Sequence, residues 1–164
     1  MGWTYAKFLL AHERSGIAQV GRSKRAIQRI KDIARIEQAY GDKLINDPAF
    51  ARKIAEVELE LSALEYTELR SLAKEAQGKG PGPESSLLKI KGTDLQQACT
   101  ELAMEAVGYY ANPHINERIG SNWGVGPEYS TNLAGNYFNF RKASIYGGSN
   151  EIQRNIIAKM VLGL

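Results

Sequence analysis

The stretch DPAFARKIAEVELELSALEY, residues 47–66, carries a complete helix signal. Asp47 before Pro48 is typical of a helix N-cap followed by proline at the first helical position. Glutamates and lysines separate apolar residues that recur every three or four positions, namely Phe50, Ile54, Val57, Leu61 and Leu64. This spacing predicts a helix with one solvated face and one apolar face that packs against other helices.

The segments on either side of this stretch are also helical in pattern. Residues 3 to about 40 contain no proline and place apolar residues at helical spacing, with Gly41-Asp42 as the stop signal. The run QGKGPGPE, residues 77–84, predicts a flexible connection. A third helix is predicted from residue 85 or 86 to Tyr110.

The last third of the chain alternates a loop with two shorter helices. Residues 112–129 are rich in Asn, Gly and Pro, which indicates a loop, a common place for function. A fourth helix is predicted over about 131–144, and a fifth begins at Ser149 or Asn150. No strand alternation is present, so the sequence predicts an all-α fold, an up-and-down helical bundle of four to five helices.

The composition is that of an ordinary soluble domain. The chain has 164 residues, 43% of them hydrophobic, and a formal net charge of +3, too small to indicate nucleic-acid binding although it favours an anionic ligand. No apolar run approaches the roughly 20 residues of a membrane span, and the start lacks a secretory signal, so we expect a cytoplasmic protein. The single cysteine, Cys99, is expected to be a small buried residue, and two histidines form no visible metal-ligand cluster.

Glu13 is the candidate general base on the first predicted helix. It lies within the apolar face that Ala6, Leu10, Ile17 and Val20 form at helical spacing. Burial of a carboxylate raises its pKa toward the range that a base needs near neutral pH. The alternative is a structural glutamate at the helix edge or paired with a neighbouring helix.

Arg14, the next residue, suits a phosphate or a carboxylate, although a surface ion pair is the commoner outcome. Gly16 and Gly21 lie within the same predicted helix, where glycine is unfavourable. Their presence indicates close approach of a backbone or a ligand, and close helix packing explains them equally well.

The motif YGGSNEIQR, residues 146–154, combines a tight glycine turn with Ser149 as a candidate N-cap. The free N–H groups of such a helix start attract anions. A plain turn between helices is the alternative. The run GVG at 124–126 follows no strand and lacks the spacing of a dinucleotide fingerprint.

Two long stretches resemble one enzyme family. IYGGSNEIQRNIIAKMVLGL, residues 145–164, resembles the C-terminal signature of the acyl-CoA dehydrogenases, and GWTYAKFLLAHERSGIA, residues 2–18, resembles the start of their C-terminal helical domain. The resemblance implies that residues 1–164 are this α-helical domain, separate from the family's N-terminal helical and middle β-domains. It also implies a role in fatty acid metabolism, the FAD-dependent oxidation of the α,β bond of an acyl-CoA. The domain alone is expected to be inactive and to bind FAD weakly or not at all.

The same resemblance assigns roles to the residues of the glycine turn. The implied substrate-binding residues are Arg14, Tyr146, Gly147 and Gly148. The implied FAD-binding residues are Ser149, Asn150 and Glu151.

The resemblance also implies the position of the catalytic base. Many members carry a glutamate directly after the tyrosine, where this chain has Gly147. Branches that resemble the isovaleryl-CoA and long-chain enzymes carry it on the first helix of this domain, before an arginine, and Glu13 before Arg14 matches that placement. Glu13 is therefore the expected base, Gly147 leaves room for it, and Arg14 helps to hold the glutamate or the thioester.

Two segments depart from the family pattern. The family commonly has an Arg-x-x-Phe-Gly element where this chain has ARIEQAYGDKLINDPAF, residues 34–50, and its glycine-rich loop is replaced at 109–129. No FAD contact is expected from either segment. Similar divergence occurs in branches that act on dicarboxylic or steroid side-chain thioesters, some of them pairs of unlike subunits.

The implied partners are the missing domains, an acyl-CoA substrate, an electron-transfer partner and further subunits, in a homo- or hetero-oligomer that is a dimer or a tetramer. The alternative function is that of a non-catalytic assembly subunit of a heteromeric acyl-CoA dehydrogenase.

Overall fold

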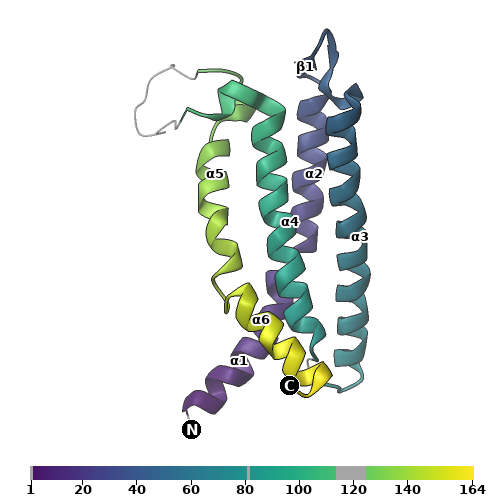
Figure 1. Ribbon diagram of the computed structural model, residues 1–164, viewed down its shortest axis with the longest axis vertical. Coiled ribbons are helices and arrows are strands. Elements are labelled where there is room, and N and C mark those ends of the chain that lie inside the picture. Colours follow the sequence, from purple (N-terminus) through teal and green to yellow (C-terminus); the bar gives the residue numbers. More distant parts are fainter. Residues whose placement is uncertain (1, 81, 114–124) are drawn as a thin grey trace.

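The computed structural model describes residues 2–80, 82–113 and 125–164, without the side chains of residue 7 and residues 10–15. Four helices run alternately up and down beside one another, and α4 contacts each of the other three (Figure 1). They are α2 (Val20–Ala34), α3 (Pro48–Ala76), α4 (Glu84–Val107) and α5 (Leu133–Phe140). Helices α1 (Gly2–Ile17) and α6 (Asn150–Ile157) lie together at one end of this bundle. The predicted all-α, up-and-down bundle is confirmed.

Helix α3 forms as its sequence predicts. The Asp47 carboxylate accepts a hydrogen bond from the backbone N–H of Phe50 at 2.8 Å, and Pro48 is the first helical residue. The predicted apolar stripe is buried along its whole length, from Phe50 to Leu64. It packs in the core cluster with apolar residues of α2 and α4.

The single helix predicted over residues 3 to about 40 is wrong, because the chain breaks between α1 and α2. Gln19 has a left-handed backbone with φ of 46°, and Ala18 is completely buried. A Cβ added at Gly92 of α4 would lie 2.5 Å from Ala18 Cα, so the two backbones meet at this break. By contrast, no described atom lies within 4 Å of a Cβ built at Gly16 or Gly21. The close approach therefore involves Gly92 and not those two glycines.

A short hairpin follows α2, and its two strands, of 2 residues each, are too short to show strand alternation in the sequence. Strands β1 (Gln38–Ala39) and β2 (Asp42–Lys43) pair antiparallel. Between them Tyr40 and Gly41 have φ of 54° and 88°. Positive φ at both central residues is typical of a two-residue hairpin turn. A 3-10 turn, Leu44–Asn46, then leads into α3.

The later helices begin and end close to the predicted positions. Helix α4 ends at Val107, where Gly108 has φ of 61°, and a 3-10 turn follows over Gly108–Ala111. Within the predicted loop 112–129, residues 114–124 lie outside the described residues, and Glu128–Ser130 form another 3-10 turn.

Short turns also extend the last two helices. Helix α5 continues as the 3-10 turn Arg141–Ser144. Helix α6 continues as a π-helical turn over Ala158–Leu162.

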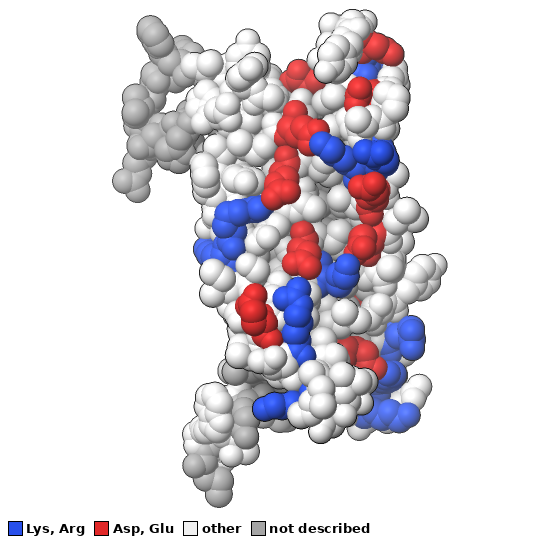
Figure 2. Space-filling model, viewed as in Figure 1, with Lys and Arg blue, Asp and Glu red and all other residues white. Residues whose placement is uncertain are grey.

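The surface over α3 and α4 carries charges of both signs in close pairs (Figure 2). Lys53 pairs with Glu105 at 2.6 Å, and Lys91 pairs with Glu60 at 2.7 Å. This pairing leaves little net charge on that face. In the described ranges, no helix has both the length and the apolar character that a membrane crossing requires.

Candidate functional site

A stripe of polar residues on α4 supports the candidate site. Ser86, Lys89, Thr93 and Gln96 follow one another at spacings of three, four and three residues, so they share one face of the helix. All four are at most 4% exposed. Because buried polar groups need hydrogen-bond partners, the partners of this stripe show which segments α4 holds in place.

Gln96 holds the break between α1 and α2. Its Nε2 donates to the backbone carbonyl of Ile17 at 2.9 Å and to that of Ala18 at 3.4 Å. The tight packing of Ala18 on Gly92 lies on the same face of α4. The last turn of α1 is therefore fixed against the middle of α4.

Lys89 joins α4 to both ends of the turn that precedes α6. Its ammonium donates to the Ser144 carbonyl at 3.1 Å and to Asn150 Oδ1 at 2.7 Å. Asn150 Nδ2 in turn donates to Thr93 Oγ1 and to Asp94 Oδ1, both at 3.3 Å. Burial lowers the pKa of Lys89, and the carboxylates of Asp94 and Glu151 oppose this shift.

Gln153 and Ser86 hold the glycine turn itself. Ser86 donates to Gln153 Oε1 at 2.8 Å, and Gln153 Nε2 donates to the carbonyls of Gly147 and Gly148 at 3.2 and 3.3 Å. The two glycines have φ of 67° and 87°, a conformation that residues with a Cβ rarely adopt. Both glycines are therefore required by the backbone of this turn.

The space around the glycine turn is narrow. A Cβ at Gly147 would lie 2.6 Å from Ile17 Cδ1, and one at Gly148 would lie 2.7 Å from Gln153 Nε2. The space beside Gly147, which was expected to leave room for Glu13, is instead occupied by Ile17, the last residue of α1. The end of α1 and the glycine turn consequently face each other at the same point of the molecule.

The start of α6 presents an N-terminus capped by a side chain. Ser149 Oγ accepts from the N–H of Ile152, as predicted. The pKa of Glu151 is lowered by hydrogen bonds from its own N–H and from the Ser149 hydroxyl. Ser149 and the Glu151 carboxylate therefore already satisfy the N–H groups of Ile152 and Glu151, and the helix dipole favours the negative charge of Glu151 at this end.

Six of the predicted site residues, Tyr146 to Glu151, are consecutive in the sequence and form the glycine turn and the start of α6. Tyr146 is 39% exposed, whereas Asn150 is buried with its side chain bonded to α4. Glu13 and Arg14 belong to α1, but their side chains lie outside the described part of the chain. Ile17, which follows Glu13 by four residues, contacts the glycine turn.

Sequence reasoning missed the supporting residues Ser86, Lys89, Thr93 and Gln153. Their signal was present as polar residues at helical spacing between buried apolar neighbours such as Leu88 and Leu95. A solvated helix face gives the same pattern in the sequence, so only the packing against α1 and α6 distinguishes a buried polar stripe from an exposed one.

Comparison with known proteins gives one consistent result. Residues 1–162 match the C-terminal domain of acyl-CoA dehydrogenases. Acyl-CoA dehydrogenase IpdE1 of Mycobacterium tuberculosis is 30% identical over 174 residues, which cover 99% of this chain and 38% of that protein. The chain thus spans about two fifths of this relative.

Solved structures share the fold. The ChsE4-ChsE5 complex of Mycobacterium tuberculosis matches with a TM-score of 0.77 and 25% identity, over 100% of this chain and 41% of that one. PigA with FAD and proline matches with a TM-score of 0.75 and 19% identity, over 94% of this chain and 37% of that one.

Proposed function

The chain belongs to the acyl-CoA dehydrogenase family, whose C-terminal domain it matches over residues 1–162, and from this premise we propose that it is the C-terminal helical domain of a longer FAD-dependent acyl-CoA dehydrogenase. The N-terminal helical and middle β-domains of that enzyme lie outside the 164 residues. The proposed reaction is α,β-dehydrogenation of an acyl-CoA thioester. The observation that carries the proposal is the contact between the glycine turn and the last turn of α1.

The turn offers its backbone to a cofactor or a thioester, while Ile17 and Gln153 fill the space where side chains at its two glycines would lie. Gly147 and Gly148 present no side chains, and Gln153 holds both of their carbonyls. The positive end of the α6 dipole, next to the Ser149 cap, suits an electron-rich group. Because the Asn150 side chain is bonded to α4, Asn150 contributes its backbone N–H to this surface.

In the proposed mechanism, Glu13 takes the α-proton of the acyl-CoA and Arg14 helps to hold the glutamate or the thioester. A bound FAD would supply the acceptor for the hydride that leaves the β-carbon. Gly147, Gly148 and Tyr146 form the wall against which the thioester and acyl group lie. The stripe on α4 keeps this wall and the end of α1 at a fixed separation, which is the preorganisation that proton abstraction requires.

A second candidate is a non-catalytic assembly domain. The absence of the Arg-x-x-Phe-Gly element and the similarity to one chain of the ChsE4-ChsE5 complex favour a heteromeric assembly. In that case the helices serve subunit packing, and the glycine turn serves only to join α5 and α6.

Flavin content separates the two candidates. We expect the longer protein to retain flavin through purification, and its absorbance to bleach anaerobically when a suitable acyl-CoA is added. The 164-residue chain, which lacks the other side of the cleft, should lose FAD during purification. A longer protein that is folded but free of flavin, alone and with its partner subunit, would contradict the proposed activity.

A further inference from the structure

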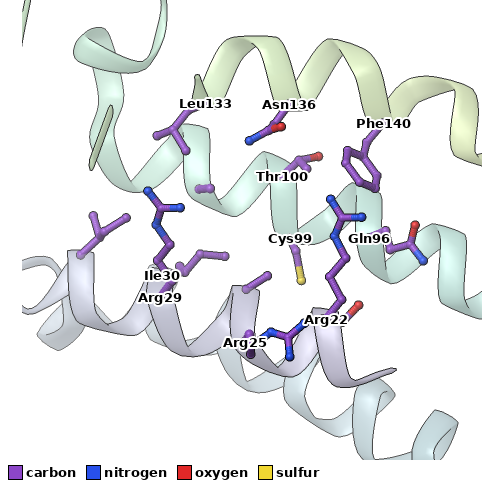
Figure 3. A pocket seen from close by; sticks show the side chains of 14 residues that line it. Arg22, Arg25, Arg29, Ile30, Gln96, Cys99, Thr100, Leu133, Asn136 and Phe140 are labelled. Carbon is purple, nitrogen blue, oxygen red and sulfur yellow. The ribbon is translucent and has the colours of Figure 1, made fainter. Parts of the chain in front are cut away.

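A cleft of about 520 Å³ lies between α2, α4 and α5, and no residue of the glycine turn is among its lining residues (Figure 3). Its volume is within the range of about 300–1,000 Å³ that is usual for small-molecule sites. Most of its surface is apolar, with Ala26, Ile30, Ile33, Ala103 and Leu133 among the lining residues. The cleft can therefore cover an apolar body several carbon atoms long.

Three arginines of α2 line this cleft, and no aspartate or glutamate is among its lining residues, all of which the structure describes. Arg22, Arg25 and Arg29 follow at spacings of three and four residues, so they extend about 10 Å along one side of the helix. Figure 3 shows the guanidinium groups of Arg22 and Arg29 reaching from α2 toward α5, on either side of Ile30 and Cys99. The cleft thus has an apolar floor and a positively charged edge.

The other basic residues of α2 contrast with these arginines. Lys24 and Lys31 point to α3, where they pair with Glu65 and Glu58. Among the described residues the contacts of Arg22 are neutral: its Cζ lies 4.7 Å from the ring centroid of Phe140, and its Nη1 donates to Gln19 Oε1. Arg29 donates to a backbone carbonyl, that of Tyr129. No carboxylate within the described ranges compensates these arginines.

Two buried polar atoms of the same cleft lack partners. Ser23 Oγ and Gln96 Oε1 are the buried side-chain N or O atoms without a hydrogen bond in the described part of the chain, and both residues line the cleft. Ser23 is 2% exposed and Gln96 is 4% exposed. Because buried polar atoms are rarely left unpaired, this pair indicates a missing hydrogen-bonding group.

We propose that the cleft between α2, α4 and α5 binds a small amphipathic anion, an apolar body that carries a carboxylate or phosphate group. The guanidinium groups of Arg22 and Arg29 bind the anionic group, and the apolar floor covers the body. A hydroxyl or amide of the ligand pairs with Ser23 or with Gln96 Oε1. No residue of the glycine turn lines this site, although Gln96 belongs both to the cleft and to the polar stripe of α4. The proposal does not depend on the proposed dehydrogenase activity.

The test is an NMR titration of the isotope-labelled 164-residue chain with three probes of equal chain length. These are decanoate, decyl phosphate and decyltrimethylammonium, each kept below its micelle concentration, with circular dichroism to confirm that the chain is folded. We expect saturable shifts within α2, α4 and α5 for at least one of the two anions, and none for the cation. Comparison of decanoate with decyl phosphate shows which anionic group the site prefers.

Matched variants test the role of the arginines. The double variant Arg22→Gln with Arg29→Gln should raise the dissociation constant about tenfold, because it removes the charged donors of the cleft. The control, Lys24→Gln with Lys31→Gln, removes the same charge from the same helix and should leave the affinity within about twofold. Ala103→Phe, which fills the cavity, should abolish binding while the arginines remain.

Several results would overturn the proposal. They are equal binding of the cation, equal loss of affinity in the two double variants, and the absence of saturable binding to a folded chain. Binding by the 164-residue chain that is lost in the longer protein would show that another protein domain covers the cleft. That result would also overturn the assignment to a small molecule.

Discussion

Replacement of Lys89 by methionine removes the link between α4 and the glycine turn. Lys89 is completely buried, and its ammonium donates to Ser144 O at 3.1 Å and to Asn150 Oδ1 at 2.7 Å. Methionine keeps most of the apolar stem but leaves both oxygens without this donor. The variant therefore isolates the contribution of the ammonium.

The expected destabilisation is about 2–3 kcal/mol. Hydrogen bonds that involve a charged group contribute about 1.5–3 kcal/mol each, so the two bonds together contribute about 3–6 kcal/mol. Part of this is offset because the variant no longer buries a charge. In a chain of this length the melting temperature should fall by about 5–10 °C.

Lys91→Met is the matched control, since it makes the same change two residues later on the same helix. Lys91 lies on the surface and pairs with Glu60 at 2.7 Å, with a side chain 46% exposed. Exposed ion pairs contribute about 0.2–1 kcal/mol, so this variant should lose less than about 1 kcal/mol. The assay is urea unfolding of the 164-residue chain followed by circular dichroism. Equal free energies of unfolding for the two variants would refute the structural role of Lys89.

The pH dependence gives a second readout of the same residue. Burial lowers the folded-state pKa of Lys89 from its ordinary value of 10.5. Between the two pKa values the unfolded state binds more protons, so this residue's contribution to stability rises with pH in that window. The difference in the free energy of unfolding between the parent and Lys89→Met should therefore grow as the pH rises through this window toward 10.5. A difference that shrinks over this range would contradict the assigned burial.

Two further substitutions test the packing of the bundle. Gly92→Ala should destabilise the chain by about 2 kcal/mol or more, because the new Cβ would lie 2.5 Å from Ala18 Cα. Gly16→Ala, with no described atom within 4 Å of its Cβ, should instead leave the stability unchanged or raise it by up to about 1 kcal/mol. Thermal melts that rank the two variants in the opposite order would contradict the packing at the break between α1 and α2. Asp47→Ala removes the N-cap bond to Phe50 and should lower the free energy of unfolding by about 1 kcal/mol, whereas Asp47→Asn, which keeps the acceptor, should lose much less. Equal losses in urea unfolding for Asp47→Ala and Asp47→Asn would show that the cap bond is not formed.

The helices that sequence predicted correctly are those with local signals. Asp47, Pro48 and the apolar stripe specify α3 without reference to the rest of the chain, and Ser149 specifies the start of α6 in the same way. The break at Ala18 has no such signal, because Ala18 and Gln19 are compatible with a helix. It exists because Gly92, distant in sequence, lets α4 approach Ala18.

The residues of the candidate site likewise comprise some that a local sequence signal predicts and others that depend on packing between distant segments. The glycine turn could be predicted because positive φ selects for Gly147 and Gly148 locally. Lys89 could not, since a lysine on a helix is usually solvated and only the packing of α6 across α4 buries it. The position of Ile17 beside Gly147 likewise depends on the angle between α1 and the bundle, which no local pattern specifies.

The most direct test of the proposed function is anaerobic flavin reduction by Glu13→Gln in the longer protein. Glutamine keeps the shape of the side chain but cannot accept the α-proton, so flavin content and acyl-CoA binding should persist while the rate of bleaching falls. Loss of a positioned general base lowers the rate by about 10² to 10⁴. Glu56→Gln, a change of the same type on the exposed face of α3, should bleach at the parent rate. If Glu13→Gln reduces its flavin as fast as the parent does, Glu13 is not the base, and the proposed mechanism is wrong.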